Sequence, residues 1–220
     1  LTTEKTPYLQ LRASGQLPVG VIGEVYCQQS QDALQQLKTA LRLCQRDVVN
    51  ERVELVLTAS KSPTIESRPI RLTASLAPIS EPYQLGYVVS KLSAKHLLRA
   101  WFRHLAWQAA GANAKTIWLF LNEAWLFAPL PKLQAENYLQ VWLHYYQQGL
   151  QRPLLLAVES ALEFADVVNN PKKTEDDAVF AASKKWSEEA QDSYWRQVVP
   201  ENQREVLPIP FTKWVYELYV

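Results

Sequence analysis

The sequence predicts an α/β protein in which helices cover both faces of a mixed central sheet. The expected elements follow the chain as helix, three strands, helix, hairpin, helix, strand and further helices, with no repeat of fixed period. This mixture of strands and helices favours an α/β fold. The 220 residues are 48% hydrophobic and include eight Trp, ten Tyr and six Phe, which is enough to build a sizeable core.

We expect three parts within one domain of residues 1–220. Residues 1–30 are interpreted as an N-terminal arm and a first strand, because glycines and a proline punctuate an extended stretch. Residues 30–165 are expected to form the α/β core, and residues 166–220 a helical C-terminal part. Because the chain starts at Leu1 and contains no Met, we expect it to be a piece of a longer protein.

The core is expected to begin with a helix across residues 31–46, for which Ser30 is a suitable N-cap. Its apolar face consists of residues spaced three and four apart, namely Leu34, Leu37, Leu41 and Cys44. Alternating apolar residues then predict strands at residues 52–59 and 70–77, and a third strand follows at residues 83–90.

Further signals place the remaining elements. Ser93 predicts the N-cap of a helix that runs to about Ala110, where Gly111 ends it. The other expected elements are a hairpin of residues 116–120 and 124–127, a helix at 133–150, a buried strand at 154–158, a helix at 159–168, a polar loop at 169–177, and helices at 178–190, 192–196 and 211–219.

Composition limits the classes of partner. The net charge is +1, but residues 1–110 carry thirteen Lys/Arg against eight Asp/Glu, whereas residues 111–220 carry ten against fourteen. The first half could therefore face an acidic partner and the second half a basic one.

Cys27 and Cys44 have no paired spacing, so we expect free thiols in the cytoplasm. No apolar run is long enough for a membrane helix.

The predicted strands lack the carboxylates that a catalytic metal would need. Thr73, Ala74 and Ser75 stand where a strand would carry a ligand Asp, and the nearest acids, Glu54 and Glu66, are interpreted as solvated charges. His96, His104 and His144 have no chelating spacing, and no phosphate-binding glycine loop is present. We therefore expect no catalytic residue, no metal and no cofactor.

A run of cations is the positive feature of the chain. Lys91, Lys95, Arg99 and Arg103 recur every four residues with no acid between them, so they follow one side of the predicted helix. Such a row could contact phosphates or an acidic protein surface. It could equally be a solvated edge whose aliphatic stems shield the apolar residues beneath. We take the four residues as candidate DNA contacts.

Aromatic residues gather late in the chain. The last expected helix has an apolar stripe and carries Trp214 and Tyr216, which are our candidate partner-binding residues. Packing against the domain's own body is the other interpretation of this stripe. A partner groove would suit the acidic second half if the partner is basic.

Several residues in order resemble the C-terminal domain family of RecC, the gamma subunit of bacterial exodeoxyribonuclease V. The first of them are Leu11-Arg12, Leu17-Pro18 and Gly20, near the start of the chain. The remaining matches are Leu92-Ser93-Ala94, Leu97-Leu98, Trp101, His104-Leu105, Ala109-Ala110-Gly111, Gly149, Pro153-Leu154-Leu155, Asp192 and Tyr194-Trp195-Arg196.

The resemblance implies a PD-(D/E)xK restriction-endonuclease-like fold that has lost its active site. In such nucleases a strand carries an acid, one spacer and a lysine, whereas here the triplet is Val89-Ser90-Lys91. Only Lys91 matches, and it cannot bind a cation alone. The family also implies a non-catalytic subunit of the RecBCD complex, with the RecB and RecD motors and DNA as partners.

The resemblance therefore implies a scaffold and DNA-channel domain that acts in double-strand break repair and homologous recombination. One alternative is an active metal-dependent nuclease that uses divergent ligands such as Glu54 and Glu66. The other alternative is a protein-docking module with no DNA contact, which fits the low net charge of the chain.

Overall fold

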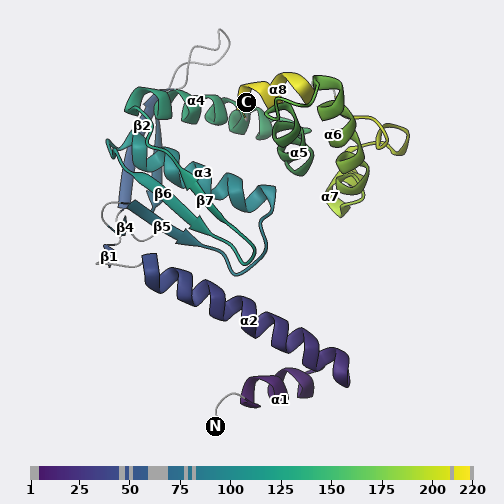
Figure 1. Ribbon diagram of the computed structural model, residues 1–220. Coiled ribbons are helices and arrows are strands. Elements are labelled where there is room, and N and C mark those ends of the chain that lie inside the picture. Colours follow the sequence, from purple (N-terminus) through teal and green to yellow (C-terminus); the bar gives the residue numbers. More distant parts are fainter. Residues whose placement is uncertain are drawn as a thin grey trace.

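A five-stranded mixed sheet forms the centre of the protein. The computed structural model describes residues 5–44, 48–49, 52–58, 69–76, 79–80, 83–208 and 211–218. Within them the strand order is β1-β4-β5-β6-β7, with β5 and β6 parallel and the other neighbours antiparallel. This confirms the expected α/β class (Figure 1). The strands are β1 (Val48–Val49), β4 (Ile79–Ser80), β5 (Tyr83–Tyr87), β6 (Lys115–Leu119) and β7 (Ala124–Phe127).

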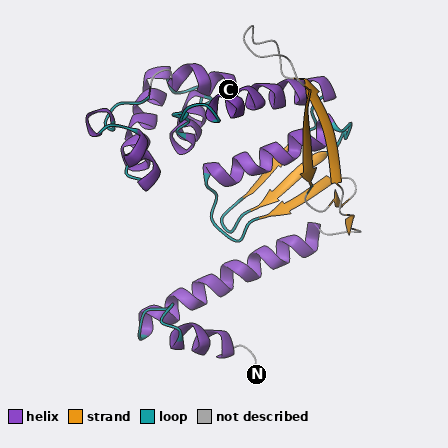
Figure 2. Ribbon diagram, turned by 180° about the vertical axis from the view of Figure 1, so that it is seen from behind, coloured by secondary structure: helices purple, strands orange, loops and turns teal. Residues whose placement is uncertain are grey.

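Helices cover both faces of this sheet (Figure 1 and Figure 2). α3 (Ala94–Ala109) connects β5 to β6, as a parallel pair requires, and its Ala100 packs with Trp118 on one face. α2 (Val21–Cys44) lies against the other face, where Leu37 packs with Leu85 and Leu119. Successive side chains of a strand point to opposite faces, which is why β5 can serve both layers.

A separate hairpin covers α3 and the helix that follows the sheet. β2 (Arg52–Thr58) and β3 (Pro69–Ser75) pair antiparallel and confirm the first two predicted strands. Leu55 and Leu72 of this hairpin pack against the cluster that joins α3 to α4 (Lys132–Gly149), a helix that the sequence also predicted. α3 therefore packs against the sheet, the hairpin and α4.

Gly86 allows β5 to come close to the next strand's largest side chain. A Cβ at this position would lie 2.4 Å from the ring of Trp118, which is only 1% exposed. Any larger residue would therefore have to displace a fully enclosed indole. The predicted third strand ends at Tyr87 rather than at residue 90, although Val88 N–H still donates to the Leu119 carbonyl at 2.9 Å.

The predicted N-terminal arm and first strand are wrong for the described part of residues 1–30. Those residues form α1 (Lys5–Ala13), a turn, and the beginning of α2, so Ser30 lies within a helix and not at its start. Gly15 and Gly20 have positive φ angles of 70° and 80°, which shows that they form a turn between helices. The glycines and Pro18 suggested an extended arm and a strand, but the Gln-, Leu- and Ala-rich stretch that follows sustains the helix.

The C-terminal part is helical, as predicted, and has its own core. Its elements are α5 (Val158–Val168), α6 (Glu175–Glu189), α7 (Ser193–Val198), the short 3-10 helix η1 (Glu201–Gln203) and α8 (Phe211–Leu218). Phe164, Trp186 and Val215 are all fully buried in this core. α6 begins earlier than predicted because Thr174 and Asp177 form a capping box at its start.

The predicted strand at residues 154–158 is wrong. No strand is assigned there; the segment is irregular, and α5 begins at Val158. Leu155 and Leu156 pack against the C-terminal core instead, so helices bury this apolar run where a sheet was expected. A short apolar run does not by itself show which kind of element will cover it.

Figure 1 also shows that α1 and the first half of α2 extend away from the sheet. Val21, Ile22 and Tyr26 of this projecting part are exposed. Within the described ranges, no helix is both long enough and apolar enough to cross a membrane.

Candidate nucleic-acid interface

Lys91 lies between the end of β5 and the start of α3. The flanking backbone is held by the turn between β6 and β7, because Leu92 N–H donates to Asn122 Oδ1 at 2.8 Å and Leu121 N–H donates to the Ser90 carbonyl at 3.0 Å. The Lys91 side chain itself is exposed. A cation is therefore presented from a well-anchored backbone at the carboxyl end of two parallel strands.

The other three cations of the row lie on α3. Lys95 and Arg99 are exposed, whereas Arg103 is half-buried with its guanidinium carbon 5.4 Å from the centroid of the Trp118 ring. Burial lowers the pKa of Arg103, and the charge of Arg99 lowers it further. Within the described ranges, no carboxylate forms an ion pair with any of these four residues. We call Lys91, Lys95, Arg99 and Arg103 the basic edge.

A neutral polar network occupies the space between α3 and the parallel strands. His104 Nδ1 lies 2.8 Å from Thr116 Oγ1, and Thr116 donates to Gln84 Oε1 at 3.3 Å; all three side chains are fully buried. Burial lowers the pKa of His104 to about 4, against a smaller opposite effect of the Ala128 carbonyl. His104 is therefore neutral at physiological pH.

Among the described residues, carboxylates do not converge beside this network. Glu54 forms an exposed ion pair of 3.0 Å with Arg71 across the β2–β3 hairpin, and Glu66 lies outside the described residues. His96 contacts Ser90 and His144 contacts Gln148, so the histidines occupy separate places. In the part of the chain that the structure describes, no three His, Cys, Asp or Glu side chains are grouped to hold a metal ion.

The first turn of α3 is held by an acid from α5. Ser93 occupies the predicted N-cap position, but its hydroxyl contacts His96 Nδ1 at 3.0 Å and makes no capping bond. The Ala94 N–H instead donates to both carboxylate oxygens of Glu159, each at 3.2 Å. The predicted position of the cap is confirmed, but the capping group comes from a distant residue.

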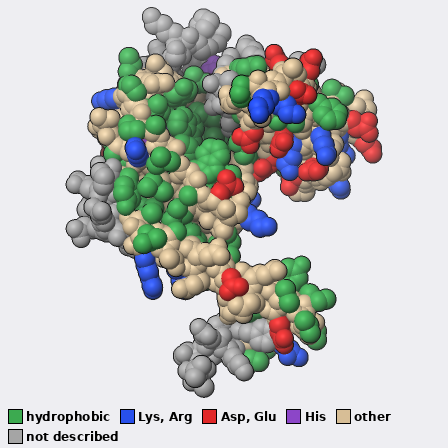
Figure 3. Space-filling view, in the orientation of Figure 1, with side chains coloured by type: hydrophobic (Ala, Val, Ile, Leu, Met, Phe, Trp, Pro, Cys, Tyr) green, Lys and Arg blue, Asp and Glu red, His purple; other side chains and the backbone are tan. Residues whose placement is uncertain are grey.

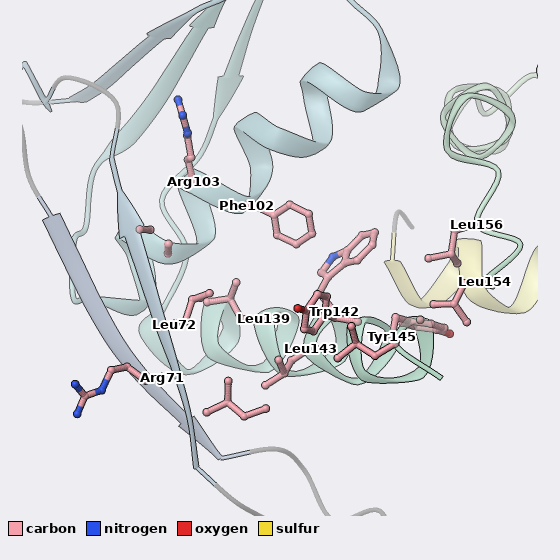
Figure 4. Close-up of a pocket in the computed structure, with 16 residues that line it drawn as sticks. Arg71, Leu72, Phe102, Arg103, Leu139, Trp142, Leu143, Tyr145, Leu154 and Leu156 are labelled. Atoms are coloured by element: carbon pink, nitrogen blue, oxygen red, sulfur yellow. The ribbon is translucent and has the colours of Figure 1, made fainter. Parts of the chain in front are cut away.

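An apolar cavity of about 830 Å³ opens between β3, α3, α4 and the segment before α5 (Figure 4). Arg71 and Arg103 line it, but Figure 4 shows both guanidinium groups pointing away from the enclosed space. The cavity therefore suits apolar side chains better than phosphates. Sequence reasoning missed it, although α4 lines it with residues spaced three and four apart, namely Leu139, Trp142, Leu143, Tyr146 and Leu150.

The two candidate partner-binding residues lie on α8. Tyr216 is 40% exposed, and its ring packs edge-on against Phe164 with centroids 5.6 Å apart. The Trp214 side chain lies outside the described residues. Figure 3 shows charged side chains of both signs gathered over the C-terminal helices, whereas the side of the sheet and α4 is hydrophobic over a broad area.

The fold is thus a mixed α/β domain with a helical extension, a row of unpaired cations and no grouped metal ligands among its described residues. Residues 2–169 match the family model of the RecC C-terminal domain, so the chain belongs to that family. The matched part ends at Asn169, the C-cap of α5.

A relative of known identity is the RecBCD enzyme subunit RecC of Escherichia coli (strain K12). It is 27% identical over 154 residues, which are 70% of this chain and 13% of that protein. The chain therefore corresponds to a small part of the length of this relative.

Proposed function

We propose that this domain is a non-catalytic part of a RecBCD-type helicase–nuclease, acting in the bacterial cytoplasm in DNA repair and recombination. It would help to hold RecB- and RecD-like motor subunits and present its basic edge to DNA phosphates. Family membership supports the assignment to such a complex. The main support for DNA contact is that Lys91, Lys95 and Arg99 are exposed and have no carboxylate partner within the described ranges.

The proposal includes a PD-(D/E)xK-like ancestry with a lost metal site. Its support is the crossover from β5 through α3 to β6, with Lys91 just beyond β5 and only neutral groups in the buried network of Gln84, Thr116 and His104. Carboxylate oxygens are the ligands that Mg²⁺ requires, and an amide, a hydroxyl and an imidazole do not replace them well.

The DNA contact is tested by replacing Lys91, Lys95, Arg99 and Arg103 with Gln in the assembled complex. Each lost phosphate contact removes about one unit from the slope of log affinity against log salt, so the slope should fall by up to about four units. Because Arg103 also packs on Trp118, the triple change that keeps Arg103 should still remove up to about three units.

A matched control neutralises four exposed cations that lie away from α3, namely Arg152, Lys172, Lys173 and Lys184. This variant should keep the wild-type salt dependence. If the basic-edge variants unwind and bind DNA with an unchanged salt response, the assigned DNA contact is wrong.

Nuclease activity of the domain itself is tested by incubating the purified chain with linear DNA and Mg²⁺. We expect no more cleavage than in EDTA, since Glu54 is an exposed side chain paired with Arg71 on the hairpin. Magnesium-dependent cleavage that disappears in Glu54→Ala would establish the alternative, an active enzyme with divergent ligands.

The apolar cavity favours a second candidate function, a protein-docking module that never touches DNA. A photo-crosslinking residue placed at Lys95 or Arg99 distinguishes the two candidates in the assembled complex. DNA adducts would support the proposed contact, and adducts to protein alone would support docking.

A further inference from the structure

The first turn of α3 carries Lys95 and lies just after Lys91, so whatever holds this turn sets where Lys95 lies relative to Lys91. Helix termini leave backbone N–H groups without intrahelical partners, and the N-cap side chain normally satisfies one of them. Ser93 does not do so here, although its backbone is extended (φ −144°, ψ 157°) as an N-cap requires. Glu159 instead bonds the N–H of Ala94, the first helical residue, whereas an N-cap side chain bonds the second or third.

Glu159 is held in turn by the next helix. Its own N–H and that of Ser160 donate to the Glu189 carboxylate at 3.4 and 3.0 Å, and the Ser160 hydroxyl donates at 2.7 Å. Ser160 is fully buried, so these bonds lie within packed structure. The N-terminus of α5 is thus bound to α6, and the N-terminus of α3 is bound to α5.

The segment before α3 is anchored independently. Leu92 N–H is bound to Asn122 in the β6–β7 turn, two residues before Ala94. Lys91 and Lys95 therefore flank two bonded backbone N–H groups. The N–H of Leu92 is bound to the β6–β7 turn of the sheet, and the N–H of Ala94 is bound to the C-terminal helices through Glu159. A cation on a fixed backbone loses less conformational freedom when it meets a phosphate than one on a frayed turn does.

We infer that Glu159 is a positioning residue that holds the first turn of α3 so that Lys91 and Lys95 face DNA together. This inference rests on the proposed DNA contact of the basic edge. Through Glu159 the C-terminal helices contribute to that contact without touching DNA. The family match includes these helices only as far as the end of α5.

Charge alone makes the opposite prediction for this residue. Glu159 brings a carboxylate to the basic edge, so its removal would strengthen attraction of DNA if only net charge mattered. If Glu159 acts by positioning, its removal weakens the DNA contact despite the gain in positive charge. The sign of the change therefore separates the two effects.

The test compares Glu159→Ala, Glu159→Gln and Glu163→Ala in the assembled complex. Glu163 is an exposed acid one turn later on α5, so its loss gives the same charge change and leaves the carboxylate bonded to Ala94 in place. We expect Glu159→Ala to lower DNA affinity and to reduce the salt slope by up to about one unit, since Lys91 stays anchored through Leu92 to the β6–β7 turn. Glu159→Gln keeps an acceptor oxygen and should retain most of the wild-type slope, and Glu163→Ala should bind DNA at least as well as wild type.

Hydrogen exchange of the same variants supplies a readout that does not depend on DNA. Loss of a capping bond should raise the exchange rate of the Ala94 amide about five- to tenfold in Glu159→Ala only. Wild-type exchange at Ala94, or a rise in DNA affinity equal to that of Glu163→Ala, overturns the positioning role. If exchange rises but neutralising Lys91 and Lys95 leaves DNA binding unchanged, the proposed function fails and Glu159 is a structural cap only.

Discussion

Replacing Trp186 with Ala is expected to lower the free energy of unfolding by about 3–5 kcal/mol, the range found for large aromatic residues removed from cores. Trp186 is 0% exposed and lies edge-on to Trp195 with ring centroids 5.3 Å apart. Its removal leaves a cavity within a core packed from several helices, so the surroundings can collapse only in part.

Urea unfolding followed by circular dichroism measures this effect. Phe180→Ala is the matched control, since Phe180 lies on the same helix and is 75% exposed. It should change the free energy of unfolding by no more than about 0.5 kcal/mol. Equal effects of the two substitutions would mean that the C-terminal core is not packed as described.

The second large effect is a loss of stability in acid that originates at His104. The folded-state pKa of His104 is lowered to about 4 by burial, below the unfolded value of about 6.5. Below pH 6.5 the unfolded chain takes up a proton that the folded protein excludes, so stability falls as the pH drops towards 4. A difference of about 2.5 pKa units corresponds to at most about 3.4 kcal/mol.

This loss is measured as the free energy of unfolding at several pH values between 7 and 4. Carboxylates also titrate in this range, so the informative quantity is the difference between wild type and His104→Gln. The variant should be less stable at pH 7, where the bond to Thr116 is lost, but should lose less stability on acidification. If wild type and His104→Gln lose the same stability on acidification, His104 is accessible to protons in the folded protein.

Local patterns predicted most of the central elements correctly. Strands β2 and β3, the β6–β7 hairpin, α3 and α4 follow from alternation, helical spacing and the glycine at residue 111, all of which act between near neighbours. Gly111 was predicted to end α3, and its φ of 102° is a positive value that glycine adopts readily at the end of a helix.

Two parts of the chain were predicted wrongly, and in one of them the covering layer decides the outcome. Residues 154–158 are apolar enough for a buried strand, but α-helices cover them and they remain irregular. For these residues the contacts with the C-terminal helices select one of two structures that the local composition fits. The glycines before residue 21 were interpreted as marking an extended arm, whereas Gly15 and Gly20 lie in a turn between α1 and α2.

Two features of the candidate site could be determined from the sequence alone, because they depend only on residue type and on the helical or strand period. They are the four-residue spacing of the basic edge and the lack of acids on the predicted strands 70–77 and 83–90. The tertiary structure decided that Glu159 bonds the start of α3 across 65 residues, that His104 is enclosed, and that an apolar cavity opens beside α4. Each of these features depends on residues that come from separate helices and strands. Burial and hydrogen bonding between such residues leave no repeating pattern in the sequence, so only the folded structure reveals them.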